Sequence, residues 1–277
     1  SVLGASFAKG SVFPVVAALV QDVNCGHRVE LAAVLVELAA PLGRDGAIEL
    51  ILPVMSLLTE DESTNVRLAV INHLPSIIAV VGLSEKDDLL PMIRRLGEDK
   101  NWRVRHAILQ LLPRLAKELG PGPFWQAFQA ILTACIADHC YLVREDWIHS
   151  MSAVAELPGF GGEWLEADVL TVAVRMADEK SYQLRAVVLS CLGKFASTVS
   201  ANFLEATLLP PALAMAGDAV PNLRLLCARA LSAAAPHATP ALSTEKRIPK
   251  LQELAADSDI DVKFSAEEAL EALNAMA

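Results

Sequence analysis

Seven basic side chains recur along the chain at nearly constant intervals, and each follows an acidic residue at short range. The basic positions are Arg28, Arg67, Arg105, Arg144, Arg185, Arg224 and Lys263, with successive spacings of 39, 38, 39, 41, 39 and 39 residues. A carboxylate near a guanidinium or ammonium group could take part in acid–base chemistry or form a buried ion pair. Seven copies of one catalytic pair are not expected in a single chain, so the period favours a ladder of structural ion pairs.

The acidic and proline positions follow the same period. The acidic residues are Asp22, Asp61, Asp99, Asp138, Asp178, Asp218 and Asp257. The segment from Asp178 to Arg185 is one residue longer than the others, so the fifth unit carries an extra residue. Fourteen residues before the basic positions lie Pro14, Pro53, Pro91, Ala130, Thr171, Pro210 and Pro249. Self-similarity at about 40 residues, with two apolar helical stretches in each unit, is typical of HEAT-type solenoids.

We therefore predict an all-α fold, a HEAT-repeat α-solenoid in which antiparallel helix pairs wind into a right-handed superhelix. The whole chain should form one array of about seven repeats, with predicted ranges 9–46, 47–84, 85–121, 122–162, 163–200, 201–242 and 243–277. Val2, Leu3 and Phe7 make the N-terminal end apolar, whereas the outer face of a terminal repeat is polar. We therefore expect that further repeats precede this segment.

The third repeat shows how each unit is expected to fold. Its first helix should bury Leu89, Leu90, Ile93 and Leu96, and its second should bury Val104, Ile108, Leu111, Leu112 and Leu115. Asp99 ends the first helix and is expected to cap the second. Gly120 and the proline-rich stretch after it should end the second helix.

Composition excludes several classes of function. The net charge is −10 and the pI is about 5.1, which argues against a nucleic-acid partner. Charges or prolines interrupt the apolar runs before the roughly 20 residues that a spanning helix needs, so we expect a soluble chain without a membrane span. The five cysteines include no CxxC pair, which favours reduced thiols in a cytosolic or nuclear protein.

No catalytic constellation is present in the sequence. Phosphate-binding, dinucleotide-binding, serine-hydrolase and zinc-protease motifs are all missing. Cys135, His139 and Cys140 form the one cysteine–histidine cluster, and without a second ligand pair it is weak as a zinc site. We predict no catalytic, cofactor-binding or metal-binding residue, and no enzymatic activity.

A column of large side chains is more informative. Counting back three residues from the basic positions reaches Thr64, Trp102, Tyr141, Tyr182, Pro221 and Ile260 in the second to seventh units. The position should lie in the turn between the two helices, so stacking would bring these side chains into a row along one edge. Tyrosine and tryptophan are favoured interface anchors, which indicates a protein-binding edge. The alternative is that each ring folds back over its own turn and caps the helix pair.

Four segments of the chain resemble the scaffold (A) subunits of protein phosphatase 2A. They are GEDKNWRVRHAI, ADHCYLVRE, LAMAGDAVPNLR and the terminal DSDIDVKFSAEEALEAL, in matching order and spacing. The resemblance covers essentially the whole chain, as the C-terminal HEAT repeats of that family. It implies contacts with the phosphatase catalytic subunit at Trp102, Arg103, Tyr141, Tyr182, Val220 and Ile260. Pro221 departs from the family pattern and could shift the turn that presents Val220.

The resemblance implies a non-catalytic scaffold in a serine/threonine phosphatase holoenzyme. The intra-repeat turns would bind the catalytic subunit, and the chain would help to recruit a variable regulatory subunit. The scaffold would be a monomer within a heterotrimer, in the cytoplasm and also in the nucleus. The alternative is a HEAT-repeat adaptor for transport or cytoskeletal partners unrelated to phosphatase. Such import adaptors are expected to carry acidic or Trp/Asn ladders on their inner helices, and these are not evident in the sequence.

Overall fold

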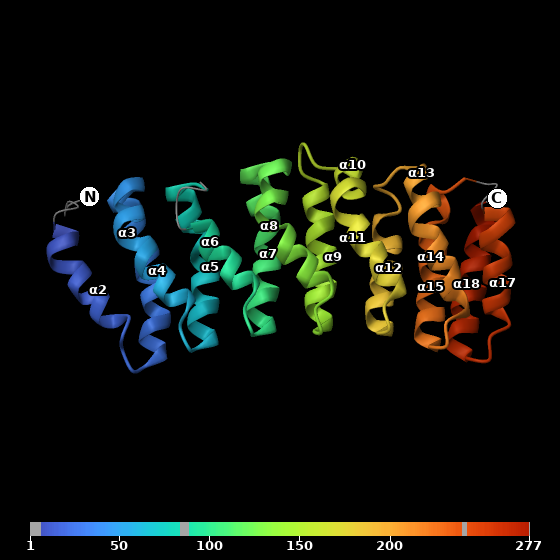
Figure 1. Cartoon of the computed structure of the whole chain (residues 1–277), viewed down its shortest axis with the longest axis horizontal. Helices are drawn as coiled ribbons and strands as arrows, with labels where there is room; N and C mark the ends of the chain where they lie inside the picture. The colour runs from blue at the N-terminus through green and yellow to red at the C-terminus, as the bar shows by residue number, and fades with distance from the viewer. Residues whose placement is uncertain (1–6, 84–88, 240–242, 277) are drawn as a thin grey trace. The chain divides into compact units, whose positions relative to one another are not determined.

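The computed structural model of the chain describes residues 7–83, 89–239 and 243–276, and all statements below concern these residues. Every regular element within them is a helix, and consecutive helices are arranged as antiparallel pairs (Figure 1). The all-α prediction is therefore confirmed. Val2 and Leu3, on which the expectation of preceding repeats partly rested, lie outside the described residues.

The chain divides into two compact units, Ser1–Ile131 and Leu132–Ala277, with the division inside helix α8 (Pro121–Ile136). The first unit contains α2 (Phe13–Leu19), α3 (Cys25–Gly46), α4 (Leu52–Thr59), α5 (Thr64–Val81), α6 (Leu89–Gly97) and α7 (Trp102–Leu119). The second contains α9 (Tyr141–Ala155), α10 (Gly162–Trp164), α11 (Leu170–Val174), α12 (Tyr182–Phe195), α13 (Ala201–Phe203), α14 (Leu209–Ala214), α15 (Pro221–Ala233), α17 (Ile248–Ala255) and α18 (Ile260–Met276). The seven repeat boundaries stay a prediction.

Wider helical turns accompany several of the recurrent prolines. The π-helical turns Ala47–Ile51, Leu204–Leu208 and Ser243–Arg247 come directly before α4, α14 and α17. Each of these three helices has its proline as the second residue. Proline lacks a donor N–H and its ring clashes with the carbonyl four residues earlier, and a π turn at this place relieves that clash. The chain thus keeps its helical course through the proline.

The third repeat packs as the apolar spacing predicts. All nine side chains expected in its core are buried: Leu89, Leu90, Ile93, Leu96, Val104, Ile108, Leu111, Leu112 and Leu115. Helix α7 ends at Leu119 because Gly120 adopts a positive φ of 74°, which glycine tolerates. The prediction that Asp99 caps α7 is wrong. Asn101 is the N-cap and accepts the Arg103 N–H, while Asp99 accepts the Asn101 N–H and holds the turn before the helix.

Ion pairs join consecutive repeats, which confirms the predicted ladder for four positions. The pairs are Arg28–Asp61, Arg67–Asp99, Arg185–Asp218 and Arg224–Asp257, and in each the guanidinium donates from Nε and Nη2 to the two carboxylate oxygens. The same arginines donate from Nη1 to a backbone carbonyl six residues earlier. In each of these repeats, the arginine thus joins the second helix both to the turn before it and to the next repeat.

The fifth repeat differs from the predicted register. Arg185 donates from Nη1 to the carbonyl of Glu179 at 2.8 Å, so Glu179 stands at the acidic position. The sequence predicts Asp178 at this position, and the hydrogen bond corrects that prediction to Glu179. The extra residue therefore lies before the acidic position, and the spacing from acid to arginine is the same as in the other repeats.

One helix of the described residues, Thr64–Val81, is long and apolar enough to cross a membrane by length and composition alone. Half of it is buried inside the structure, and its Arg67 is ion-paired with Asp99. These contacts are those of a core helix.

Candidate protein-interaction surface

The column of large side chains occupies one defined place in the fold. Each member is the first residue of a second helix: Thr64 of α5, Trp102 of α7, Tyr141 of α9, Tyr182 of α12, Pro221 of α15 and Ile260 of α18. The prediction that these residues lie in the turn is wrong by one position, since each is the first residue of the helix that follows the turn. Because Cα–Cβ bonds tilt towards a helix's N-terminus, first-turn side chains still lean over the turn.

In the second unit these side chains form an exposed row. Helices α9, α12, α15 and α18 pack side by side in this order (Figure 1). Tyr141 is 61% exposed, Tyr182 is 41% exposed and Ile260 is 79% exposed. The alternative in which each ring is folded away over its own turn therefore does not describe the two tyrosines. We call Tyr141, Tyr182, Pro221 and Ile260 the first-turn row.

Phe264 extends the row and was missed in the sequence. It lies one helical turn after Ile260 in α18 and is 60% exposed. The missed signal was the spacing of four residues, which places two large apolar side chains on the same helix face. Together they form an apolar patch at the start of α18, which is the kind of surface that a partner protein covers.

Trp102 differs from the tyrosines because its own helix covers part of it. The guanidinium carbon of Arg103 lies 4.6 Å from the centre of the indole ring, and the His106 ring meets it edge-on at 6.0 Å between centroids. The indole is half-buried rather than exposed as predicted, whereas Arg103 is exposed. A cation over an indole face is itself attractive, so the two residues present one joint surface.

Val220 is the N-cap residue of α15 and is half-buried. Its N–H donates to Oδ1 of Asp218 at 2.9 Å, as the N–H of Asn101 does to Asp99. Pro221 therefore leaves the turn unchanged, contrary to the shift considered from the sequence. The reason is that the first residue of a helix has no intrahelical partner for its N–H, so proline removes nothing there.

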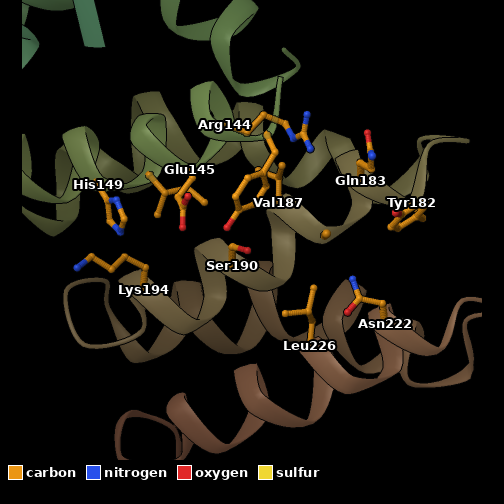
Figure 2. A pocket seen from close by; sticks show the side chains of 13 residues that line it. Arg144, Glu145, His149, Tyr182, Gln183, Val187, Ser190, Lys194, Asn222 and Leu226 are labelled. Atoms are coloured by element: carbon orange, nitrogen blue, oxygen red, sulfur yellow. The ribbon is translucent and has the colours of Figure 1, made fainter. Parts of the chain in front are cut away.

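A pocket of about 520 Å³ opens between α9, α12 and α15 in the second unit (Figure 2). Tyr141 and Tyr182 line it at the helix starts, and His149 and Lys194 line it further along α9 and α12. A hydrogen bond with the Glu145 carboxylate raises the pKa of Tyr141. Two residues of the first-turn row, Tyr141 and Tyr182, therefore line this pocket.

No group of three or more histidine, cysteine or acidic side chains that could hold a metal ion occurs among the described residues. Of the weak cluster named in the sequence, Cys135 is buried in α8, while Cys140 is the half-buried residue before α9. The other tryptophans pack as expected in two cases, since Trp147 and Trp164 are buried, and Trp125 is half-buried.

Residues 47–211 match the family model described as PIK3R4-like, middle domain, and this is more than half of the chain. The chain belongs to this family. No curated protein sequence is significantly similar to the chain.

Solved structures share the fold at low sequence identity. Kap95p, in a structure concerned with its binding to RanGDP, aligns with a TM-score of 0.62 at 15% identity and covers 96% of this chain and 36% of its own. Importin beta aligns with a TM-score of 0.64 at 15% identity, covering 93% and 35% of the two chains. Cex1p gives 0.63 at 14% identity, with 95% and 53% covered. The chain thus spans about a third to a half of these structures, and the α-solenoid prediction is confirmed as a helical-repeat fold.

Proposed function

We propose that the protein is a non-catalytic scaffold that holds a serine/threonine phosphatase catalytic subunit on the first-turn row of its second unit. The observation that carries the proposal is the exposure of Tyr141, Tyr182 and Ile260 at equivalent places on helices that pack in sequence, with Phe264 one turn after Ile260. The aromatic rings bury much area with little loss of side-chain entropy when a partner docks.

The identity of the partner rests on the sequence segments that resemble phosphatase 2A scaffold subunits. Membership of the PIK3R4-like family and the importin-like fold support a scaffold and leave the partner open. A regulatory subunit held by the same chain would raise the effective concentration of substrates near the catalytic subunit. The five cysteines are not joined in disulfides, which supports the proposed cytoplasmic and nuclear location.

A binding titration with purified phosphatase 2A catalytic subunit tests the proposal. The variant Tyr141→Ala/Tyr182→Ala/Ile260→Ala should weaken binding at least about a hundredfold, since single aromatic anchors contribute about 2 kcal/mol or more. Val34→Ala, which truncates an exposed apolar residue of α3 that is not a member of the row, is the matched control and should leave binding unchanged.

Equal affinities of the row variant and the wild type would exclude the row as the docking site. Binding of RanGDP in place of the catalytic subunit, with the row variant inactive, would favour the transport-adaptor alternative. The RanGDP arm is chosen because a similar structure, that of Kap95p, concerns this partner.

A further inference from the structure

One rung of the ion-pair ladder is missing within the second unit. Arg144 is only 5% exposed, as buried as Arg28 and Arg67 of the complete rungs, and its Nη1 donates to the carbonyl of Asp138 at 2.5 Å. Among the described residues, Arg144 forms no ion pair with a carboxylate, and Nη1 is the nitrogen of its guanidinium that donates a hydrogen bond. Arg185, one repeat later, holds Asp218 with both of these nitrogens.

The gap follows from the residue at the acidic position of the fifth repeat. The carbonyl of Glu179 takes the place that aspartate carbonyls take elsewhere, but the side chain of Glu179 is one methylene longer. In the complete rungs the aspartate carboxylate is fixed by the N–H two residues later, as in Asp218 to Val220. Glu179 makes no such bond to Ser181, and it is exposed. Its carboxylate is therefore not held in the turn as the aspartates are, and it forms no ion pair with Arg144.

A buried guanidinium without a counter-charge destabilises a fold unless something compensates it. Arg144 lines the pocket between α9, α12 and α15, where Figure 2 shows it towards the end occupied by Gln183 and Tyr182. Apolar side chains of Ile148, Val187 and Leu226 line the same pocket. Arg144 and an apolar surface thus line one pocket.

The charge of the pocket contrasts with that of the chain. The protein has a net charge of −10, yet two cationic side chains, Arg144 and Lys194, line this pocket against one carboxylate, Glu145. Glu145 is already engaged by the hydroxyl of Tyr141. An anionic group entering the pocket therefore meets unpaired positive charge next to apolar surface.

We propose that this pocket receives an acidic side chain of a partner protein, whose carboxylate completes the missing rung on Arg144. The carboxylate would accept from Nε and Nη2, as the aspartates do in the other rungs. A neighbouring apolar side chain of the partner would pack on Ile148, Val187 and Leu226. The proposal rests on the proposed function in that Tyr141 and Tyr182 of the first-turn row border the same pocket, but the assay below contains no phosphatase.

Fluorescence anisotropy with the whole chain and a labelled peptide of alternating leucine and glutamate tests the site. The matched probe is the same peptide with glutamine in place of glutamate. The wild type should bind the glutamate peptide at least about tenfold more tightly, and Arg144→Gln should remove this difference. Arg229→Gln, a change of an exposed arginine on α15, should leave it intact.

Glu179→Asp is the second variant, because it restores the residue of the complete rungs. We expect the new carboxylate to pair with Arg144, to raise the melting temperature and to lower the affinity for the glutamate peptide. Equal binding of both peptides by the wild type would overturn the proposal, as would a preference that survives in Arg144→Gln. A preserved preference in a chain that does not bind the phosphatase would refute only the proposed function.

Discussion

Arg224 donates to Asp257 from Nε to Oδ2 at 2.6 Å and from Nη2 to Oδ1 at 2.9 Å, so a bidentate ion pair joins α15 to the turn before α18. The hydrogen bond from Arg224 lowers the pKa of Asp257 to about 2 from its ordinary value of 3.8, although burial opposes the shift. Asp257 thus shows how the ladder makes stability depend on pH.

A carboxyl with a lowered pKa stabilises the fold fully above its unfolded pKa, and this contribution disappears as the pH falls through its folded pKa. We therefore expect the free energy of unfolding to decline as the pH is lowered from about 4 to about 2. Arg224→Gln should make this decline shallower, because the pKa of Asp257 returns towards its ordinary value. Urea unfolding at several pH values measures the slope, and Arg229→Gln on the same helix should keep the wild-type slope. A wild-type slope in Arg224→Gln would contradict the assignment.

Trp102→Ala should separate binding from folding. The indole is half-buried against Arg103 and His106 of its own helix, so its loss should lower the free energy of unfolding by about 1 to 2 kcal/mol. Docking of the phosphatase catalytic subunit should weaken by about 2 kcal/mol or more, as for other aromatic anchors. Thermal unfolding of the free variant and a binding titration give the two values. A loss of 3 to 5 kcal/mol in stability with unchanged affinity, roughly that of a core residue, would place Trp102 in the core.

The periodic features of the fold could be predicted from the sequence, because the packing of a repeat depends on residues at fixed spacing. The buried stripes of α6 and α7 and the pair Arg67–Asp99 follow directly from that spacing. Features that depend on one side chain's length or contacts could not. The acidic position of the fifth repeat is an example, since Asp178 and Glu179 are adjacent acids and only the hydrogen bond from Arg185 distinguishes them.

The candidate site was predicted only in part, because its positions follow from the repeat spacing but the contacts of its individual side chains do not. The column position was evident, and Tyr141, Tyr182 and Ile260 are exposed there. The partial cover of Trp102 comes from the rotamers of its neighbours, which a residue count does not contain. The unpaired Arg144 was not predicted either. The sequence pattern around Arg144 is the same as around the paired arginines, and the pattern does not show whether a carboxylate reaches the guanidinium.

The cysteines should differ sharply in reactivity. Cys25 is exposed, whereas Cys135, Cys191 and Cys227 are buried. Burial raises the pKa of Cys227 to about 12 and also raises the pKa of Cys191, so neither forms the reactive thiolate at neutral pH. We expect a thiol reagent to label Cys25 in the folded protein and to reach Cys191 and Cys227 only after unfolding. Mass spectrometry of the labelled peptides identifies the sites, and early labelling of Cys191 would show that its helix opens readily.

Gly162 begins α10 where the helix meets the turn after α12. A Cβ added at Gly162 would overlap the carbonyl oxygen of Thr198, and backbone has no rotamer by which to move away. We therefore expect Gly162→Ala to lower the free energy of unfolding by about 1 to 3 kcal/mol, the usual range for overpacking. Gly193→Ala in α12 is the matched control, since its Cβ would lie 4.0 Å from the Cα of Ala230. There, alanine's higher helix propensity should raise stability by about 0.5 to 1 kcal/mol. Thermal unfolding of both variants compares the two effects, and a neutral Gly162→Ala would mean that the two segments do not approach this closely.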